Sequence, residues 1–201
     1  NNTGWLDDCD FQHEQDIIEC LHGPVELAIS CLPYFLNERV AKVCIDNKIP
    51  YFDLGGHVGT SKAINDYAVE HDGQVFTDLG LAPGWVNIMA EECYRKLNQI
   101  DTVVTVRLNC GGLQDNAGNP PFNYKRTWST EGLINEYKDA CWILDDGVRE
   151  VVPGMSGILG VYGYEEFHTS GGIGKTLDLM EKRGVINCSY KTLRHPGHIK
   201  A

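Results

Sequence analysis

Residues 25–56 read VELAISCLPYFLNERVAKVCIDNKIPYFDLGG, and this stretch decides the fold. It begins with a short apolar run that Pro33 closes and ends with a second apolar run that Gly55 and Gly56 close. Between the two runs, apolar residues recur at the spacing of an amphipathic helix; they are Leu36, Val40, Val43 and Cys44. A strand, a helix and a second strand predict a parallel βαβ unit.

The same alternation continues to about residue 98. Residues 61–73 predict a helix, residues 74–84 a strand that leaves through a Gly/Pro loop, and residues 85–98 a third helix. This pattern predicts an α/β fold, the C-terminal half of a Rossmann-type parallel sheet with helices over both faces. We expect its ligand beyond the carboxyl ends of the strands, where the polar and glycine-rich residues lie. The G-x-G-x-x-G turn does not occur, so we expect the first βαβ unit to precede Asn1.

From about residue 99 the pattern changes. Residues 101–112 alternate apolar and polar residues, and residues 141–152 predict two strands about an Asp-Asp-Gly turn. The remainder predicts an α+β mixed sheet with few helices. A change from parallel α/β to α+β patterning marks a domain boundary. We therefore predict a partial Rossmann-type domain over 1–98 and a mixed-sheet domain over 99–201, the latter incomplete.

Composition excludes several classes of partner. The formal net charge of −11 argues against nucleic acid and anionic membranes, which select basic surfaces. No apolar run approaches the ~20 residues of a membrane span, and the acidic N-terminus does not resemble a signal peptide. The eight cysteines are dispersed without a C-x-x-C pair, so we interpret them as mostly reduced in a cytoplasmic protein, with disulfides as the alternative. Cys31 and Cys44, in apolar segments, are predicted core residues.

The stretch TSGGIGKT, Thr169 to Thr176, raises the question of a phosphate-binding loop and a P-loop phosphotransferase. Gly174, Lys175 and Thr176 supply the second half of that motif, but Thr169 stands where its first glycine belongs. The preceding residues 162–168 are polar and aromatic rather than a buried apolar strand. The prediction is a glycine turn that links a strand to a helix.

Seven strings, in order and in register, are similar to the saccharopine dehydrogenase family, most of all to its lysine-dehydrogenase-type bacterial members. They are LPYFLN, YFDLGGH, GLAPGWVNIMA, GGLQ, TWSTEGLINEY, FHTSGG and YKTLRHPGH. The resemblance spans about residues 10–198 and covers the middle part of that family. It implies an oxidoreductase that uses NAD or NADP, acts on an amino acid, and forms a homodimer through its mixed-sheet substrate domain. Ala82 stands where saccharopine reductases have Asp, which favours a smaller amino acid than saccharopine.

The resemblance also assigns site residues. Arg194 would hold a substrate carboxylate, since a guanidinium binds carboxylates through two parallel hydrogen bonds; the alternative is a surface salt bridge. His57 or Lys191 would transfer the amine proton, although His57 has the alternative of bonding only its own loop. Cys110 is expected as a neutral thiol that lines the pocket. Further substrate-binding candidates are Asn87, Thr169, Ser170 and His198.

The predicted cofactor-binding residues follow the strands of the first domain and its Gly/Pro loop; they are Pro33, Tyr34, Gly55, Gly56, Leu81 and Pro83. For Pro33 and Tyr34 a purely structural role is the alternative. His195 and His198 form an H-x-x-H pair, but Pro196 and Gly197 interrupt any helix that would aim both rings one way, so no metal is expected. Tyr137, Trp128 and Trp142 are predicted core or interface aromatics. The competing functional hypothesis is a cofactor-free binding or scaffold dimer derived from the same family.

Overall fold

The computed structural model of the chain describes residues 10, 13–21, 24–115 and 121–201. They form two compact units, residues 1–80 and 81–201, which we call the first unit and the second unit. The division falls at Gly80, before the expected boundary at residue 98, because helix α4 (Trp85–Leu97) packs against strand β4 (Thr105–Cys110). None of the helices in the described ranges is long and apolar enough to cross a lipid bilayer.

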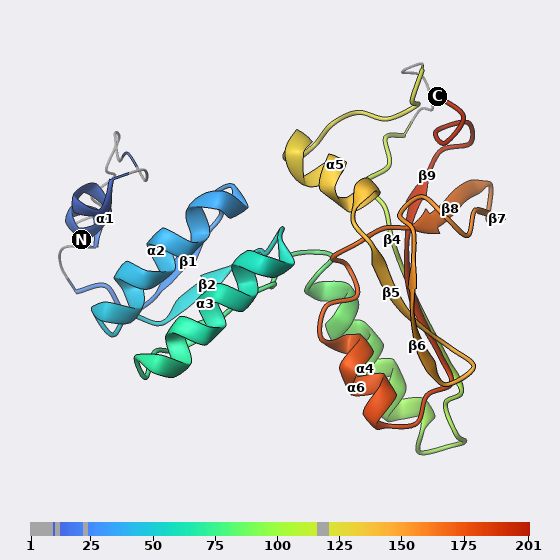
Figure 1. The fold of residues 1–201 in the computed structure, drawn as a ribbon, viewed down its shortest axis with the longest axis horizontal. Helices are drawn as coiled ribbons and strands as arrows, with labels where there is room; N and C mark the ends of the chain where they lie inside the picture. Colours follow the sequence, from blue (N-terminus) through green and yellow to red (C-terminus); the bar gives the residue numbers. More distant parts are fainter. Residues whose placement is uncertain (1–9, 11–12, 22–23, 116–120) are drawn as a thin grey trace. The chain divides into compact units, whose positions relative to one another are not determined.

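The first unit is built on a parallel three-stranded sheet in the order β1-β2-β3. Its elements in chain order are α1 (Glu14–Cys20), β1 (Ala28–Ser30), α2 (Tyr34–Asp46), β2 (Tyr51–Asp53), α3 (Val58–Glu70) and β3 (Val75–Phe76). Figure 1 shows α2 and α3 side by side along this sheet. The predicted α/β alternation over residues 25–76 is therefore confirmed.

The helices of the first unit share one face of its sheet. Ile17 of α1, Val40 of α2 and Ile64 of α3 belong to one buried cluster with Tyr51 of β2. Consecutive right-handed crossovers between strands in sequential order place their helices on the same side, so the prediction of helices over both faces is wrong for the described part of this unit. On the opposite face Phe76 remains half exposed and stacks on Phe52 of the neighbouring strand, with ring centroids 4.7 Å apart.

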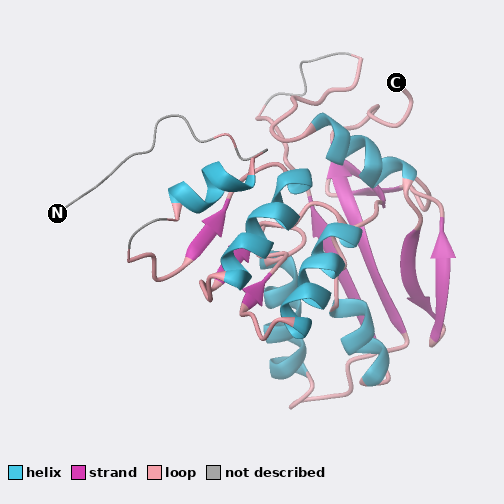
Figure 2. Cartoon of the chain, turned by 60° about the vertical axis from the view of Figure 1, so that its left-hand side comes forward, coloured by secondary structure: helices cyan, strands magenta, loops and turns pink. Residues whose placement is uncertain are grey.

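The second unit is built on a mixed six-stranded sheet. Its strands are β4, β5 (Cys141–Asp145), β6 (Val148–Val152), β7 (Leu159–Val161), β8 (Tyr164–His168) and β9 (Asn187–Arg194). The order is β6-β5-β9-β8-β7, and β4 pairs with β9 in parallel while every other pairing is antiparallel. The helices are α4, α5 (Thr130–Lys138) and α6 (Thr176–Lys182); Figure 2 shows them against the strands. The predicted mixed sheet is confirmed.

The two faces of this sheet differ. Alternate residues of β9 are buried, and Cys188 and Tyr190 on that face pack with Leu108 of β4 and with Leu177 and Met180 of α6. We call this the helix face. The other face carries the odd-numbered residues of β9, which are only partly buried. This alternation decides which polar side chains of β9 can act together.

The cysteines follow the prediction only in part. Six of the described cysteines are free thiols, and Cys44, Cys141 and Cys188 are buried as expected of small apolar side chains. Cys31 is exposed, so its predicted place in the core is wrong: it follows the last residue of β1. Cys20 is disulfide-bonded, which corrects the expectation of a reduced thiol at that position. Cys9 lies outside the described residues.

Candidate active site

Arg194 is the last residue of β9, beside the end of β4. Because β4 and β9 are parallel and Cys110 pairs with Thr192, both strands bring their carboxyl ends to the same edge of the sheet. The Arg194 side chain is 3% exposed and lies on the helix face. Its Nη1 donates to the carbonyl of Leu193 at 2.9 Å, and its guanidinium carbon lies 4.6 Å from the ring centroid of Tyr124. Across the described ranges, no carboxylate lies within 4.0 Å of its nitrogens.

A chain of hydrogen bonds orients this guanidinium. Arg194 Nε donates to the hydroxyl of Tyr137 at 3.0 Å, and that hydroxyl lies 2.9 Å from His198 Nε2. His198 Nδ1 lies 2.7 Å from the carbonyl of Phe122, so Nδ1 carries the proton and donates. Burial lowers the pKa of His198, which keeps the ring neutral and makes Nε2 the acceptor for Tyr137. The donor and the acceptor of each hydrogen bond in this chain are therefore fixed, and the orientation of Arg194 depends on both Tyr137 and His198.

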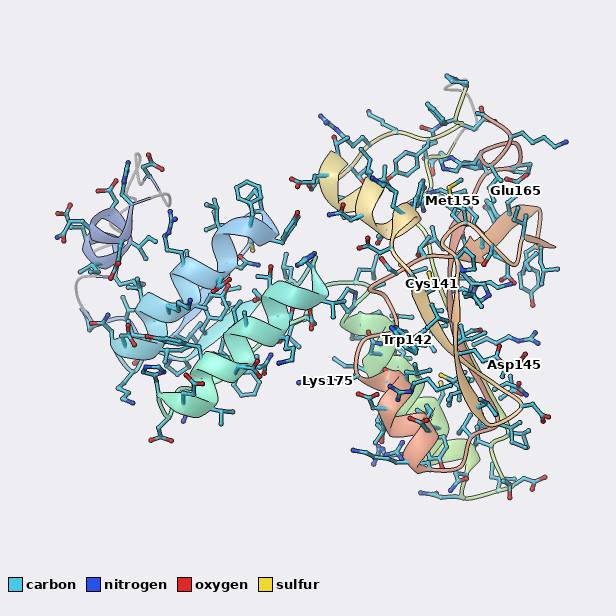
Figure 3. All side chains as sticks on the ribbon, viewed as in Figure 1. Cys141, Trp142, Asp145, Met155, Glu165 and Lys175 are labelled. Atoms are coloured by element: carbon cyan, nitrogen blue, oxygen red, sulfur yellow. The ribbon has the colours of Figure 1, made fainter. Side chains whose placement is uncertain are left out.

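The segment after β9 is held by the sheet itself. Glu165 of β8 accepts hydrogen bonds from the backbone N–H of Gly197 at 2.8 Å and of Ile199 at 3.3 Å; Figure 3 labels Glu165 near this C-terminal segment. His195 Nε2 lies 2.8 Å from the carbonyl of Gln114. In the described part of the chain no three His, Cys, Asp or Glu side chains form a group that could hold a metal ion. The two histidines of the H-x-x-H pair thus form hydrogen bonds that hold this segment in place.

Glu136, in the last turn of α5, is a titratable group that the sequence predictions missed. Burial raises the pKa of its half-buried carboxyl to about 7, although the positive charge of Arg194 opposes this shift. The pKa of the Cys110 thiol is also raised, chiefly by burial, with Glu136 raising it and Arg194 lowering it. The expectation of a neutral thiol at Cys110 agrees with this direction. Three groups at the carboxyl ends of β4 and β9 therefore influence one another.

The turn between β8 and α6 is fastened to this region. The Thr169 hydroxyl is buried and lies 2.7 Å from the hydroxyl of Thr192. The backbone N–H of Ser170 donates to the carbonyl of Glu136 at 3.0 Å, which joins the turn to α5. Thr169 and Ser170 therefore position the strand and the helix that carry Arg194 and Glu136, and direct contact of either with substrate stays a prediction.

Asn87 has a structural role in the described contacts. Its Nδ2 donates to the carbonyl of Ile173 at 2.9 Å and to the hydroxyl of Thr176 at 2.8 Å, while Oδ1 accepts from the backbone of Gly84 at 2.7 Å. These bonds tie the start of α4 to the turn before α6. The turn itself links β8 to α6, so the predicted glycine turn is confirmed, and Figure 3 shows Lys175 at the start of α6 on the side away from the strands.

Lys191 lies on the opposite face of β9 from Arg194, because the two residues are three positions apart on a regular strand. Its Nζ is 3.1 Å from Glu166 Oε1 and donates to the carbonyl of Gly157 at 2.7 Å. The other carboxylate oxygen of Glu166 accepts from Asn109 at 2.7 Å. The ammonium group is thus engaged in a largely buried ion pair, and the strand separates it from the residue with which it was expected to act.

In the first unit, the predicted cofactor residues gather at the carboxyl ends of β1 and β2. Pro33 precedes α2, and the ring of Tyr34 stacks on that of His57 with centroids 5.2 Å apart. Gly55 and Gly56 both have positive φ, and a Cβ on Gly56 would lie 3.1 Å from Cβ of Tyr34. The absence of a side chain at Gly56 therefore allows its backbone to lie against Tyr34, and the role of these residues in holding a cofactor stays a prediction.

His57 also caps α3. Its Nδ1 accepts the backbone N–H of Thr60 at 3.2 Å, so in the neutral ring the proton is on Nε2. In this geometry His57 can donate a hydrogen bond through Nε2, but it cannot take up a proton without giving up the cap. The loop-bonding alternative is thus present in the structure, and a role in proton transfer stays a prediction. Leu81 and Pro83 lie in the second unit just before α4, with Leu81 exposed.

The sequence predictions did not place Glu136 or Tyr137 in the candidate site. Both belong to the string TWSTEGLINEY, so the family resemblance marked their segment but not their roles. Tyr137 was expected only as a core or interface aromatic, whereas its hydroxyl joins Arg194 to His198. Trp142 and Trp128 are 50% and 38% exposed, which does not fit core packing within the described residues.

Comparison with known proteins shows which proteins this chain is similar to. The family model described as "Saccharopine dehydrogenase C-terminal domain" matches residues 80–201. The mitochondrial alpha-aminoadipic semialdehyde synthases of Rattus norvegicus and Bos taurus are 31% and 29% identical to the chain over 147 and 146 residues. Each alignment covers 71% of this chain and 16% of the relative, so the chain spans a small part of the relatives' length. The apo histidine-tagged saccharopine dehydrogenase (L-Glu forming) from Saccharomyces cerevisiae shares the fold, with a TM-score of 0.70 and 19% identity over 94% of this chain and 44% of that one.

Proposed function

The chain belongs to the saccharopine dehydrogenase family, and from that premise we propose that it acts as an NAD(P)-dependent oxidoreductase on the C–N bond of an amino acid. The observation that supports this most strongly is Arg194, a buried guanidinium without a carboxylate partner among the described side chains. Buried charges are normally paired. A substrate carboxylate supplies the missing partner in two parallel hydrogen bonds.

The protein's own contribution is to position substrate and protons. Arg194, oriented through Tyr137 and His198, holds the carboxylate and so fixes the position of the substrate carbon chain. His57 would donate a hydrogen bond through Nε2, and would transfer a proton only by giving up its cap on α3. Residues of the first unit would hold the nicotinamide end of NAD or NADP; they are Pro33, Tyr34, Gly55, Gly56 and His57. For Leu81 and Pro83, in the second unit, cofactor binding stays a prediction from the family resemblance. The cofactor, when bound, supplies the hydride chemistry, with the amino acid converted to an imine that water hydrolyses.

Steady-state kinetics of an Arg194→Ala variant test this proposal. Reduction of NAD or NADP is followed by absorbance with the amino acid varied, and then with the cofactor varied. We expect the KM of the amino acid to rise roughly 10- to 100-fold, as for loss of a charge-assisted hydrogen bond, and the KM of the cofactor to change little. Arg183→Ala is the matched control, since Arg183 pairs with Glu91 on the helix surface. An equal rise in both KM values would count against the assignment.

The competing hypothesis, a cofactor-free scaffold dimer, makes a different prediction. NADH and NADPH are titrated into this chain and into a version extended at its N-terminus, and binding is followed by nucleotide fluorescence. Saturable binding by either form supports a dehydrogenase, whereas binding by neither supports a scaffold. For either function we propose a homodimer through the sheet face of the second unit away from α4 and α6. Val148 and Leu159 on this face are 58% and 55% exposed, and exposed apolar area of this kind marks interfaces. Light scattering tests it: a mass of one chain would contradict the dimer.

A further inference from the structure

Glu165 and Arg194 carry opposite charges and lie opposite each other on two neighbouring strands, yet they do not pair. They are register partners in the antiparallel ladder of β8 and β9. Directly opposite residues lie on the same face of a sheet with Cβ atoms about 4.5–5.5 Å apart, so each side chain is within reach of the other. Across the described residues, however, no carboxylate oxygen lies within 4.0 Å of an Arg194 nitrogen. Since an unpaired buried charge is costly, the separation of the two groups calls for an explanation.

The carboxylate of Glu165 is held by the segment that follows β9, residues 195–199, which we call the clasp. Oε1 of Glu165 accepts a hydrogen bond from the backbone N–H of Gly197 at 2.8 Å, and Oε2 accepts one from the backbone N–H of Ile199 at 3.3 Å. Both oxygens are therefore engaged by neutral amides. A guanidinium would offer two parallel hydrogen bonds together with an opposite charge, which is a stronger pairing. It follows that contacts elsewhere in the clasp keep Glu165 from its stronger partner.

Further hydrogen bonds fasten the clasp to residues between β4 and α5. The bonded pairs are His195 Nε2 with the carbonyl of Gln114 at 2.8 Å, the carbonyl of Pro196 with Asn123 Nδ2 at 3.0 Å, and His198 Nδ1 with the carbonyl of Phe122 at 2.7 Å. Gly197 has a φ of 90°, which other residues rarely adopt, so a glycine is needed at the turn that presents this N–H to Glu165. Together these contacts offset the cost of keeping two opposite charges apart.

We propose that the clasp keeps Arg194 open for a ligand carboxylate by engaging Glu165, the side chain that would otherwise pair with it. Glu165 is thus a positioning residue of the site, and the clasp is the element that controls it. This inference rests on the proposed function and deepens it, because it adds a means of regulation. Release of the clasp frees Glu165 to occupy Arg194, and a ligand must then displace an internal carboxylate.

A variant with a loosened clasp tests the proposal. Asn123→Gly and His195→Ala together remove two of the bonds that fasten the clasp, and glycine suits the φ of 48° at residue 123. Isothermal titration calorimetry with L-lysine and with L-glutamate compares this variant with the wild-type chain. We expect the loosened variant to bind the better ligand roughly 5- to 30-fold more weakly, and addition of Glu165→Gln to restore the affinity to within about twofold of wild type. The matched control adds Glu150→Gln, at an exposed carboxylate of β6, and should restore nothing.

NMR spectra of the arginine Nε–H groups in the same variants give a readout that needs no ligand. We expect the Arg194 signal, assigned with an Arg194→Lys variant, to shift in the loosened variant and to return toward its wild-type position when Glu165→Gln is added. The spectra also show whether each variant is folded. If the loosened variant is not, Asn123→Gly alone takes its place.

The outcomes separate this inference from the proposed function. Restoration of affinity by Glu165→Gln and not by Glu150→Gln supports the inference, because a purely structural Glu165 predicts the opposite sign: one more lost bond to the clasp and still weaker binding. Such weaker binding, or wild-type affinity in the loosened variant, overturns the inference and leaves the ligand site intact. Absence of binding of both amino acids to the wild type counts against the proposed function, and the Arg194 signal then decides the inference. A shift that Glu165→Gln reverses supports it, and any other result overturns it.

Discussion

Replacement of Tyr137 by phenylalanine isolates what one hydroxyl contributes to the Arg194 site. In the wild type the oxygen accepts from Arg194 Nε at 3.0 Å and donates to His198 Nε2 at 2.9 Å. Phenylalanine keeps the ring, which packs edge-on against Phe167, and removes both bonds. A hydrogen bond to a charged group contributes about 1.5–3 kcal/mol, and a buried group left unsatisfied costs about 1–3 kcal/mol. Because effects in one network are not additive, we expect the free energy of unfolding to fall by about 2–4 kcal/mol.

Urea denaturation followed by tryptophan fluorescence reports mainly on the second unit, because three of the four tryptophans, Trp85, Trp128 and Trp142, belong to that unit. Tyr162→Phe is the matched control, since Tyr162 is 97% exposed and loss of its hydroxyl should matter by less than about 0.5 kcal/mol. If Tyr137→Phe proves as stable as this control, the hydrogen-bond chain does not support Arg194 and the reasoning is refuted.

Three other changes give predictions for separate parts of the chain. Gly56 has a φ of 126° and faces Tyr34, so Gly56→Ala is expected to destabilise the fold by roughly 1–3 kcal/mol and to weaken NADH binding. Gly160→Ala, at a position with open space around it, is expected to change neither. Thermal denaturation measures the stability and fluorescence titration measures the binding. Lys191→Ala leaves the buried carboxylate of Glu166 without its ion-pair partner, so the free energy of unfolding measured in urea should fall by about 3–5 kcal/mol. The affinity for the amino acid should stay within about twofold. A selective loss of that affinity would instead support a role of Lys191 at the site. Burial raises the folded-state pKa of Glu136 to about 7, so the contribution of this carboxyl to stability is present below its ordinary pKa of 4.5 and is lost as pH rises through 7. Glu136→Gln should therefore raise the free energy of unfolding by roughly 1–3 kcal/mol at pH 8 and leave it unchanged at pH 4. An equal effect at both pH values would contradict this.

Local chemistry made much of the fold predictable. The hairpin of β5 and β6 follows from its Asp-Asp-Gly turn, because Asp146 and Gly147 adopt the positive φ values that a tight turn between antiparallel strands requires. The strand, helix and strand over residues 25–56 follow from apolar spacing. Gly73 follows the end of α3, at a position where the Cβ of any other residue would lie 2.7 Å from the side chain of Ile45. These are short-range effects, which a single sequence records.

The candidate site was less predictable, for two different reasons. The separation of Lys191 from Arg194 was available from the sequence, since residues three apart on a strand point to opposite faces. The raised pKa of Glu136 was not, because it arises from burial in the folded chain and no local pattern marks it. Likewise, only the fold shows that Asn87 joins α4 to the turn before α6.

A crystal structure of the chain with L-lysine or L-glutamate bound tests the central claim most directly, namely that the carboxyl ends of β4 and β9 form an amino-acid site around Arg194. The account predicts the ligand carboxylate on the Arg194 guanidinium, with Tyr137 still bonded to Nε. A ligand bound elsewhere on the chain, or an Arg194 side chain paired with a protein carboxylate in the complex, would contradict it.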